Sequence, residues 1–592
     1  MKTRLIKARA LTFAILLVLA ACLPVLAAPS LQETMDGVFT RLYADLDREA
    51  LASLDSDKVL GLITDEERYV LATQYWTFNV DAAAVVSVVR HVAQEVVPFW
   101  LEEAGFIKTD MTVSDSENWT YEVWQKRVDA GPVELGINGF DMHRSVYFVC
   151  VGPQQPGGRV TISNLSPADE AVIEMRDGAW KYRDWDDLYI KGAPDALKGH
   201  HLLTTYRGRA REAHLVGAFR TTPFPSSAAP DQIVLTWSED PRATQSIQWR
   251  TGPDTKTSAV RYRKTGDQDY AQVTATCESI EDRLLMNDRY INHFTAILRG
   301  LDPATTYAYS VGNGDTWSDE AEFTTAPDGD AAFSFVCFAD THYSADAGRL
   351  IQAAFRQHPE TAFSLIAGDV VSTGLYRNEW DHVFEYGRDV FDRWPVAIAL
   401  GNHDDQDGLG ARLPLALFAL PENGPEGVEP ERTYSFRYAN ALFLVMDVGT
   451  SFEVQARWIE DQLAQTDATW KFAVFHFPLY SVEEDYAAIR EQWGQIFDKY
   501  HIDMAFHGHV HYYLRTKPMR NLQPVADAAD GTIYTISIAQ SGRRYPLPEA
   551  EYIAKRFTGV AVYPKIDVDG SRLVYRAYDI DGKVLDELII EK

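Results

Sequence analysis

The sequence predicts a multidomain α+β protein, with an N-terminal helical and then β-rich region, a central β-sandwich and a C-terminal α/β domain. Three observations lead to this prediction. The 592 residues exceed what one hydrophobic core supports, because cores stop growing near ~250–300 residues. Segments rich in Pro, Ser and Gly at 223–230 and 325–330 divide the chain. Short strands precede the second segment, whereas apolar strands alternating with helical patterns follow it.

The N-terminus, residues 1–28, has the features of an export signal. Basic residues at 2–9 precede an apolar run at 11–26, and the small residues Ala27 and Ala28 follow it. Within the run, the segment 19–22 resembles a bacterial lipobox that ends in Cys22. The chain is therefore expected to be exported, either as a periplasmic or extracellular protein or anchored in the cell envelope through a lipidated Cys22.

Residues 29–222 show a change of pattern but no chemical motif, and their role stays open. The segment 31–105 is predicted to be helical, with a capping box at Thr64–Glu67 ahead of an apolar-periodic run. Strands are predicted from about 118 to 220, among them the apolar run at 146–151 that ends at Gly152 and Pro153.

Residues 223–327 are expected to form a β-sandwich. Short strands are predicted at 233–237, 246–250 and 294–298, and the run from Leu301 to Tyr309 looks like a tyrosine corner. In these features the segment resembles a fibronectin type III domain.

Residues 331–592 alternate apolar strands with helical patterns, and metal-ligand residue types follow five of the strands. In α/β folds ligands bind at the carboxyl ends of the strands, so five such ends in sequence indicate one site rather than coincidence. The five clusters are Asp340–His342, Gly368–Asp369, Gly401–Asp404, His476 and His507–His511.

These residue types suit the hydrolysis of a phosphate ester by two metal ions. Two ions ~3.5–4 Å apart activate a water and neutralise charge on the phosphoryl oxygens. Carboxylate, imidazole and amide oxygen together suit Mn, Fe or Zn. One carboxylate must bridge the pair, and Asp369 is the sole carboxylate at its strand end. Gly401 and Gly508 are expected to permit a close approach of the backbone.

The order of these clusters resembles the calcineurin-like metallophosphoesterase superfamily over residues 331–592. The segments 476–481 and 508–516, together with the preceding sandwich, resemble its purple acid phosphatase branch. The resemblance implies a four-layer α/β/β/α domain that binds two divalent metal ions. It places one metal on Asp340, His342, Asp369 and His511, and the other on Asp369, Asn402, His476 and His509.

The resemblance gives His403 a catalytic role instead of a metal. His403 is expected near the leaving-group oxygen, as proton donor or charge stabiliser, with Asp404 orienting it. His507 matches no ligand position and is expected either to support a ligand residue from outside the metal centre or to be structural.

One position departs from the purple acid phosphatase pattern. That branch carries a Tyr three residues after the Gly-Asp aspartate, whose phenolate on Fe(III) gives the colour, whereas this chain has Ser372. A second difference is His342, a histidine that the purple acid phosphatase branch usually lacks at the corresponding position. A neutral imidazole stabilises a trivalent ion less than a phenolate does, so we expect a colourless site with two divalent metals.

The sequence therefore predicts hydrolysis of phosphate monoesters, with phosphodiesters as the alternative substrate at the same site. A formal charge of −29 disfavours polyanions, so a small phosphorylated substrate is expected and no nucleic acid. An alternative from a different functional class is a binding or adhesion protein of the cell envelope with an inactive catalytic domain. The intact ligand set argues against this alternative.

Overall fold

The computed structural model describes residues 30–141, 146–168, 170–182, 188–314, 316–405, 411–542 and 544–592, and only the backbone of Arg207. The predicted export signal and Cys22 lie outside these residues. The described chain forms two compact units, one of residues 30–182, 188–205 and 209–218, the other of residues 206–208 and 219–592. Within the described ranges, no helix combines the length and apolar character needed to cross a membrane.

The first unit begins with four short helices. Thr64 caps the fourth, where its side chain accepts from the N–H of Glu67 and the Glu67 side chain bonds back, which confirms the predicted capping box. The prediction of helix up to residue 105 is wrong between residues 74 and 98, and helix returns only at 99–103. The β-branched run at 84–89 instead forms a strand in the middle of a sheet, because valines suit a strand that is buried on both faces. The helices are α2 (Leu31–Asp45), α3 (Arg48–Ala52), α4 (Ser56–Leu62), α5 (Asp65–Thr73) and α6 (Phe99–Glu103).

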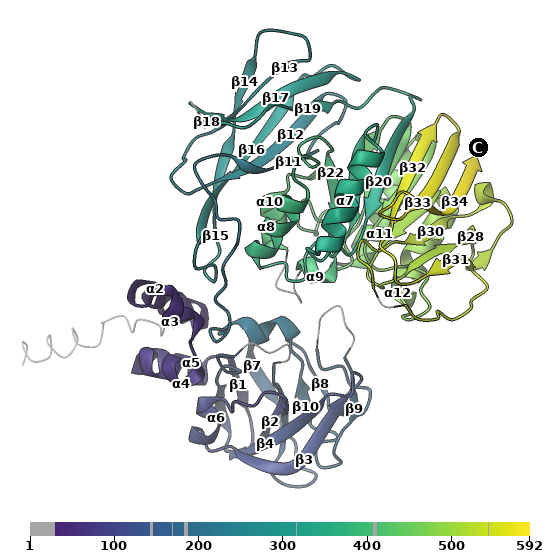
Figure 1. The fold of residues 1–592 in the computed structure, drawn as a ribbon. Helices are drawn as coiled ribbons and strands as arrows, with labels where there is room; N and C mark the ends of the chain where they lie inside the picture. Colours follow the sequence, from purple (N-terminus) through teal and green to yellow (C-terminus); the bar gives the residue numbers. More distant parts are fainter. Residues whose placement is uncertain are drawn as a thin grey trace, which may run out of the picture. The chain divides into compact units, whose positions relative to one another are not determined.

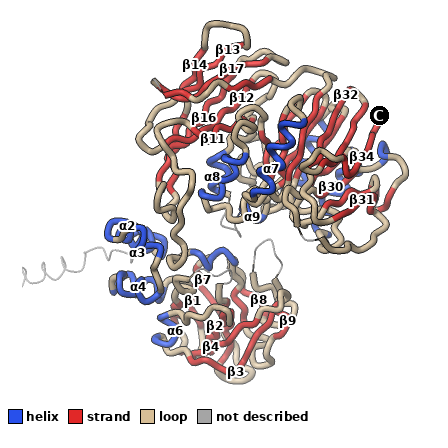
Figure 2. Tube along the Cα trace, viewed as in Figure 1, coloured by secondary structure: helices blue, strands red, loops and turns tan. Residues whose placement is uncertain are grey.

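The rest of the first unit is mainly β-structure (Figure 2), which confirms the strands predicted from about residue 118 onward, whereas the strands before residue 116 were not predicted. A seven-stranded sheet has the order β8-β10-β6-β2-β4-β3-β9, and a three-stranded sheet has the order β5-β1-β7. The strands are β1 (Trp76–Val80), β2 (Ala84–His91), β3 (Ile107–Asp115), β4 (Thr120–Val128), β5 (Gly131–Leu135), β6 (Phe148–Pro153), β7 (Ile162–Ser166), β8 (Val172–Glu174), β9 (Ile190–Gly192) and β10 (His201–Leu203).

The second unit begins with the predicted β-sandwich. One sheet has the order β11-β12-β16-β15, and the other joins β14-β13-β17-β18 with β19 paired to β17. The hydroxyl of Tyr307 accepts from the backbone N–H of Asp302 at 2.9 Å, as a tyrosine corner does. The strands are β11 (Asp231–Thr236), β12 (Thr244–Thr251), β13 (Ala259–Lys264), β14 (Ala271–Thr274), β15 (Thr276–Glu281), β16 (Tyr290–Arg299), β17 (Thr306–Asn313), β18 (Thr316–Trp317) and β19 (Ala321–Thr324).

The C-terminal domain contains two large sheets. The first has the order β22-β21-β20-β32-β33-β34 and the second β23-β24-β25-β26-β30-β27-β31. A small hairpin, β28 (Met519–Arg520) with β29 (Gln523–Pro524), is separate. The other strands are β20 (Phe333–Phe338), β21 (Phe363–Ala367), β22 (Val396–Ala399), β23 (Tyr434–Tyr438), β24 (Ala441–Val445), β25 (Trp470–Val474), β26 (Met504–His507), β27 (Tyr513–Thr516), β30 (Ile533–Ile536), β31 (Ile553–Phe557), β32 (Tyr563–Asp569), β33 (Arg572–Tyr578) and β34 (Val584–Glu591).

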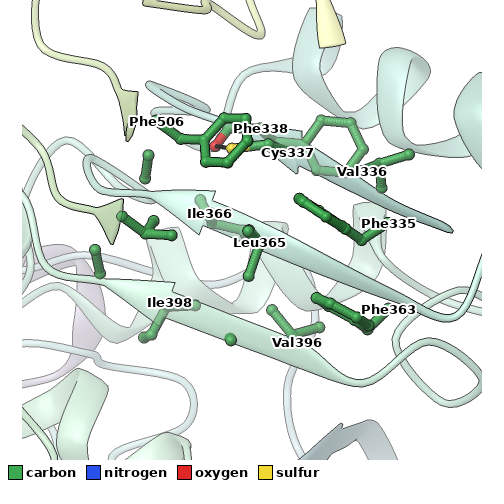
Figure 3. Close-up of a cluster of buried hydrophobic side chains, with 14 of the residues drawn as sticks. Phe335, Val336, Cys337, Phe338, Phe363, Leu365, Ile366, Val396, Ile398 and Phe506 are labelled. Atoms are coloured by element: carbon green, nitrogen blue, oxygen red, sulfur yellow. Dashed lines mark hydrogen bonds between the residues drawn. The ribbon is translucent and has the colours of Figure 1, made fainter. Parts of the chain in front are cut away.

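The two sheets pack face to face through aromatic side chains, and helices cover their outer faces. The ring of Phe335 lies 5.3 Å from that of Phe363 in its own sheet (Figure 3). It also lies 5.2 Å from the ring of Phe443 in the other sheet. Helix α7 lies beside β20 (Figure 1), and α11 packs through Trp458 on the second sheet. This arrangement confirms the four-layer α/β/β/α prediction. The helices are α7 (Ala345–Gln357), α8 (Arg377–Tyr386), α9 (Asn402–Asp405), α10 (Arg412–Leu417), α11 (Phe452–Gln465), α12 (Ala487–Ile489) and α13 (Gln495–Tyr500).

The sandwich is joined to the C-terminal domain by buried contacts. The ring of Trp237 lies 5.3 Å from that of Phe363 and 5.8 Å from that of Tyr438. The buried guanidinium of Arg250 donates to Asp381 of α8 at 2.8 Å. The sandwich and the C-terminal domain therefore form one packed unit.

Candidate metal centre

The loops that follow the parallel strands carry the candidate site. β20, β21 and β22 run parallel, as do β24, β25, β26 and β30, so their carboxyl ends lie at one edge of each sheet. Asp340, His342, Asp369 and His509 in these loops all have positive φ, between 42° and 74°. Non-glycine residues rarely adopt this region, and such strained residues cluster at functional sites.

The structure brings Asp340, His342 and His511 together as a first cluster. One ligand atom from each lies within 4.8 Å of the other two. Nε2 of His511 is 3.6 Å from Oδ1 of Asp340, and Nε2 of His342 is 3.9 Å from the same oxygen. Asp340 is fully buried, whereas the side chain of His511 is 49% exposed. The cluster therefore opens to solvent on the side of His511.

A second cluster consists of Asp369, His476 and His509, again within 4.8 Å of one another. The amide oxygen of Asn402 belongs beside it, since it lies 3.0 Å from Nδ1 of His509. The ring of His476 is oriented by its Nδ1, which lies 2.8 Å from the carbonyl oxygen of Ala367 and donates to it. Nε2 of His476 therefore faces the cluster.

Asp369 lies between the two clusters. Its Oδ2 is 3.1 Å from Nε2 of His476 and 3.6 Å from Nε2 of His342. Its Oδ1 accepts the backbone N–H of His403 at 3.0 Å, which fixes the orientation of the carboxylate. One oxygen that faces a ligand of each cluster has the placement that a bridging carboxylate requires.

The donor set fits two metal ions. Among the described residues, Nε2 of His342 is buried without a hydrogen-bond partner. Nε2 of His476 is also buried and makes no hydrogen bond of good geometry, although the Asp369 carboxylate is 3.1 Å away. Both point among carboxylates, where a cation would satisfy them. Carboxylate, imidazole and amide oxygen are the ligands that first-row metals take. The residues that would hold the ions are Asp340, His342 and His511 on one side, Asn402, His476 and His509 on the other, and Asp369 between them.

The electrostatics of the centre are those of a cation site. Burial lowers the pKa of His476, but the Asp369 carboxylate outweighs burial and raises this pKa to about 9. Burial conversely raises the pKa of Asp369, and His476, His403 and His342 reverse this and hold it well below its usual range. Asp369 is therefore a carboxylate that attracts positive charge at neutral pH.

Close backbone approach at the centre depends on glycine. A Cβ at Gly401 would lie 2.2 Å from Oδ1 of Asp369, and one at Gly508 would lie 2.2 Å from Oδ2 of Asp340. Any side chain at either position would therefore displace a carboxylate of the site, which agrees with the sequence-based interpretation of these glycines.

His403 lies at the mouth of the centre. Its Nδ1 donates to the carbonyl oxygen of Ser372 at 2.7 Å, which leaves Nε2 to face the site. Its ring lies 4.8 Å from that of His342. The two histidines line an open hollow of about 590 Å³. Four further residues line this hollow, and no sequence motif marks them: Tyr343, Ser344, Ala345 and Gln540.

The prediction that Asp404 orients His403 is wrong. The fully buried carboxylate of Asp404 accepts the backbone N–H groups of Gly401 at 2.9 Å and of Val370 and Val371 at 3.2 Å. It therefore fixes the loop after β21 against the loop after β22. The ring of His403 is oriented by the Ser372 carbonyl instead, and Asp404 affects it only through the backbone.

His507 lies away from the ligand clusters, as expected. It is buried against the ring of Phe475, with Nδ1 3.1 Å from the Phe475 carbonyl oxygen. Burial lowers the pKa of His507 to about 3, so the ring is neutral at physiological pH.

Two family matches cover adjacent parts of the second unit. Residues 230–325 match the purple acid phosphatase N-terminal domain, and residues 333–513 match the calcineurin-like phosphoesterase family. The second match contains all seven candidate metal ligands and ends two residues after His511.

Two relatives are similar to this chain at low identity. An uncharacterised protein of Mycobacterium tuberculosis is 26% identical over 293 residues, which cover 42% of this chain and 55% of that protein, so the chain spans about half the length of this relative. The Fe(3+)-Zn(2+) purple acid phosphatase 12 of Arabidopsis thaliana is 25% identical over 375 residues, covering 57% of this chain and 78% of that protein.

A solved structure shares the fold. The purple acid phosphatase from yellow lupin (Lupinus luteus) seeds superposes with a TM-score of 0.54 at 15% identity, covering 88% of this chain and 91% of that one. Residues 333–513 therefore match a calcineurin-like phosphoesterase domain, and a segment that matches the purple acid phosphatase N-terminal domain lies directly before it at 230–325.

Proposed function

We propose that the chain hydrolyses phosphate monoesters of small molecules at a centre of two divalent metal ions. The observation that carries this proposal is the position of Asp369, whose Oδ2 faces both His342 and His476. Bound ions would supply an activated water and neutralise charge on the phosphoryl oxygens. The strongly negative formal charge of the chain supports a small substrate over a nucleic acid.

Residues of the chain would provide the negative charge for the metal ions and the proton for the leaving group. Asp369 and Asp340 hold negative charge where the cations bind, and His403 faces the hollow through which substrate enters. Because Nδ1 of His403 donates to the Ser372 carbonyl, a proton for the leaving-group oxygen would come from Nε2 of the imidazolium form, which leaves the ring neutral with its N–H on Nδ1. Export of the protein, with or without lipidation of Cys22, belongs to the same proposal and rests on the sequence of residues 1–28.

The test compares p-nitrophenyl phosphate with bis-p-nitrophenyl phosphate. Wild type and Asp369→Asn are assayed after metal stripping and again after reloading with Mn, Zn or Fe. We expect metal-dependent hydrolysis with the monoester preferred, and a loss of ~10²–10³-fold in Asp369→Asn, since the bridge contributes several kcal/mol. Preference for the diester would reassign the substrate class. Absence of hydrolysis with every metal would favour a binding protein.

A further inference from the structure

Glu484 contacts His509 on the side away from the candidate metal centre. Oε2 of Glu484 lies 3.2 Å from Nε2 of His509, while Nδ1 of the same ring lies 3.0 Å from the amide oxygen of Asn402. The two ring nitrogens thus face two different oxygens. Nδ1 faces the centre, and Nε2 faces a carboxylate outside it.

The Glu484 carboxylate is held in place by its own loop. Its backbone N–H donates to Oγ of Ser481 at 3.2 Å, and the Tyr486 hydroxyl donates to its carboxylate. Ser481 is fixed in turn, because its Oγ bonds the Tyr512 hydroxyl at 2.8 Å and its carbonyl accepts from Tyr552 at 2.8 Å. The side chain of Glu484 is 53% exposed, yet it makes two directed contacts.

Aromatic side chains fix the plane of the His509 ring. The ring of Phe477 lies 4.5 Å from that of His509 in an edge-to-face arrangement, and Tyr486 stacks on Phe477 at 5.0 Å. The loop that carries Glu484 therefore also carries a ring that packs on the imidazole. Since the side chain of His509 is only 10% exposed, a change at Glu484 affects a constrained ring.

We propose that Glu484 is a positioning residue for His509, which it holds in the tautomer with the proton on Nε2 and the lone pair of Nδ1 directed at the metal. When one ring nitrogen of a histidine binds a metal, a carboxylate that accepts the N–H of the other nitrogen fixes the ring and makes it a stronger ligand. Nothing in the sequence pattern marks Glu484, which is 25 residues from His509. The inference rests on the proposed function, because it requires that His509 bind metal.

The experiment is a titration of metal-stripped protein with Zn²⁺ by isothermal calorimetry, which measures affinity without activity. In wild type we expect two Zn²⁺ ions. In Glu484→Ala, the ion held by His509 should bind about 10- to 100-fold more weakly, with the other ion unchanged. Glu484→Gln should lose less, because its amide oxygen still accepts from Nε2. Glu483→Ala, one position earlier in the same loop, should bind both ions as wild type does.

The outcomes separate this inference from the proposed function. Wild-type affinity for both ions in Glu484→Ala would overturn it. A weakening of both ions, together with a lower melting temperature of the stripped variant, would also overturn it, because that pattern marks a merely structural role. If Glu484→Ala does not fold, Glu484→Gln decides by the same criteria. Absence of Zn²⁺ binding in wild type would overturn the proposed function and this inference together.

Discussion

The hydroxyl of Ser372 lies 3.3 Å from Nδ1 of His342, so the residue that replaces the family tyrosine contacts the histidine that compensates for it. The contact orients the ring so that its other nitrogen, Nε2, faces Asp340 and Asp369. The two positions at which the sequence departs from the purple acid phosphatase pattern therefore lie in contact with each other beside the first cluster. We expect a neutral imidazole there in place of an anionic phenolate.

The first prediction concerns colour. Protein loaded with two equivalents of Zn²⁺, Mn²⁺ or iron should show no phenolate-to-iron charge-transfer band in the visible spectrum, because no tyrosine occupies position 372. Absorption spectra of the purified protein, with metal content measured on the same sample, check this. A band that survives removal of weakly bound iron would contradict it.

The second prediction concerns His403. In His403→Gln, kcat should fall by ~10²–10⁴-fold on an alkyl phosphate, whose leaving group needs a proton. The loss on p-nitrophenyl phosphate should be much smaller, because p-nitrophenolate leaves without one. Zn²⁺ affinity should be unchanged, because the proposal gives His403 no metal; a weaker affinity would show that its ring, which lies near the ligand atoms of His342 and Asp369, binds an ion. Steady-state kinetics on the two substrates measure the difference.

His358→Gln serves as the matched histidine variant, since His358 lies at the end of α7 and outside the hollow. It should leave both rates unchanged. An equal loss on the two substrates in His403→Gln would exclude proton donation and indicate charge stabilisation instead.

The third prediction concerns the junction between the sandwich and the phosphoesterase domain. Asp381 is buried between Arg250 and Arg377, at 2.8 Å and 3.5 Å. Asp381→Ala should reduce the free energy of unfolding by about 3 kcal/mol or less, because it removes one of the two buried carboxylates that pair with both guanidinium groups and leaves only Asp288 between them. Chemical denaturation followed by tryptophan fluorescence measures this.

Asp231→Ala is the control for Asp381→Ala, since Asp231 also pairs with Arg250 but its side chain is 37% exposed. Its effect should stay near ~1 kcal/mol or below. Equal effects of the two variants would show that burial of the pair is not what makes Asp381 important.

The fourth prediction concerns pH. Burial raises the pKa of Glu431 from 4.5 to about 7, although its carboxylate accepts the N–H of Leu420. The folded state then binds the proton more tightly than the unfolded chain, so this residue lowers stability as pH rises from 4.5 to 7. Glu431→Gln keeps an acceptor and removes the charge. It should be more stable than wild type at pH 8, on the order of 1 kcal/mol after allowing for partial exposure.

Below pH 4.5 the two proteins should have the same stability. Urea denaturation at pH 8 and near pH 4.5 gives the comparison, with Glu453→Gln as an exposed control. A variant that is less stable than wild type at pH 8 would show that the carboxylate of Glu431 is favourable when ionised.

Some features of the fold and site follow from short stretches of sequence. The capping box at Thr64 and the strands before Asp340, Asp369, Asn402 and His476 are local patterns, and each formed where it was predicted. Strand ends carry the ligand types because parallel strands meet at one edge, which is a general property of α/β folds. The helical prediction failed for residues 76–91 because burial in a sheet outweighed local propensity.

The sequence by itself determined the order of domains, the residues of the two clusters and the absence of a tyrosine at position 372. Only the tertiary structure decided that Asp369 presents one oxygen to both clusters, that Asp404 binds three backbone amides and that Glu484 contacts His509. The physical reason is the separation of the interacting residues along the sequence. Capping and strand patterns depend on neighbours within a few residues. The contacts named here, apart from that of Asp404 with Gly401, join residues that are 25 or more positions apart in the sequence. Only packing brings such residues within hydrogen-bonding distance.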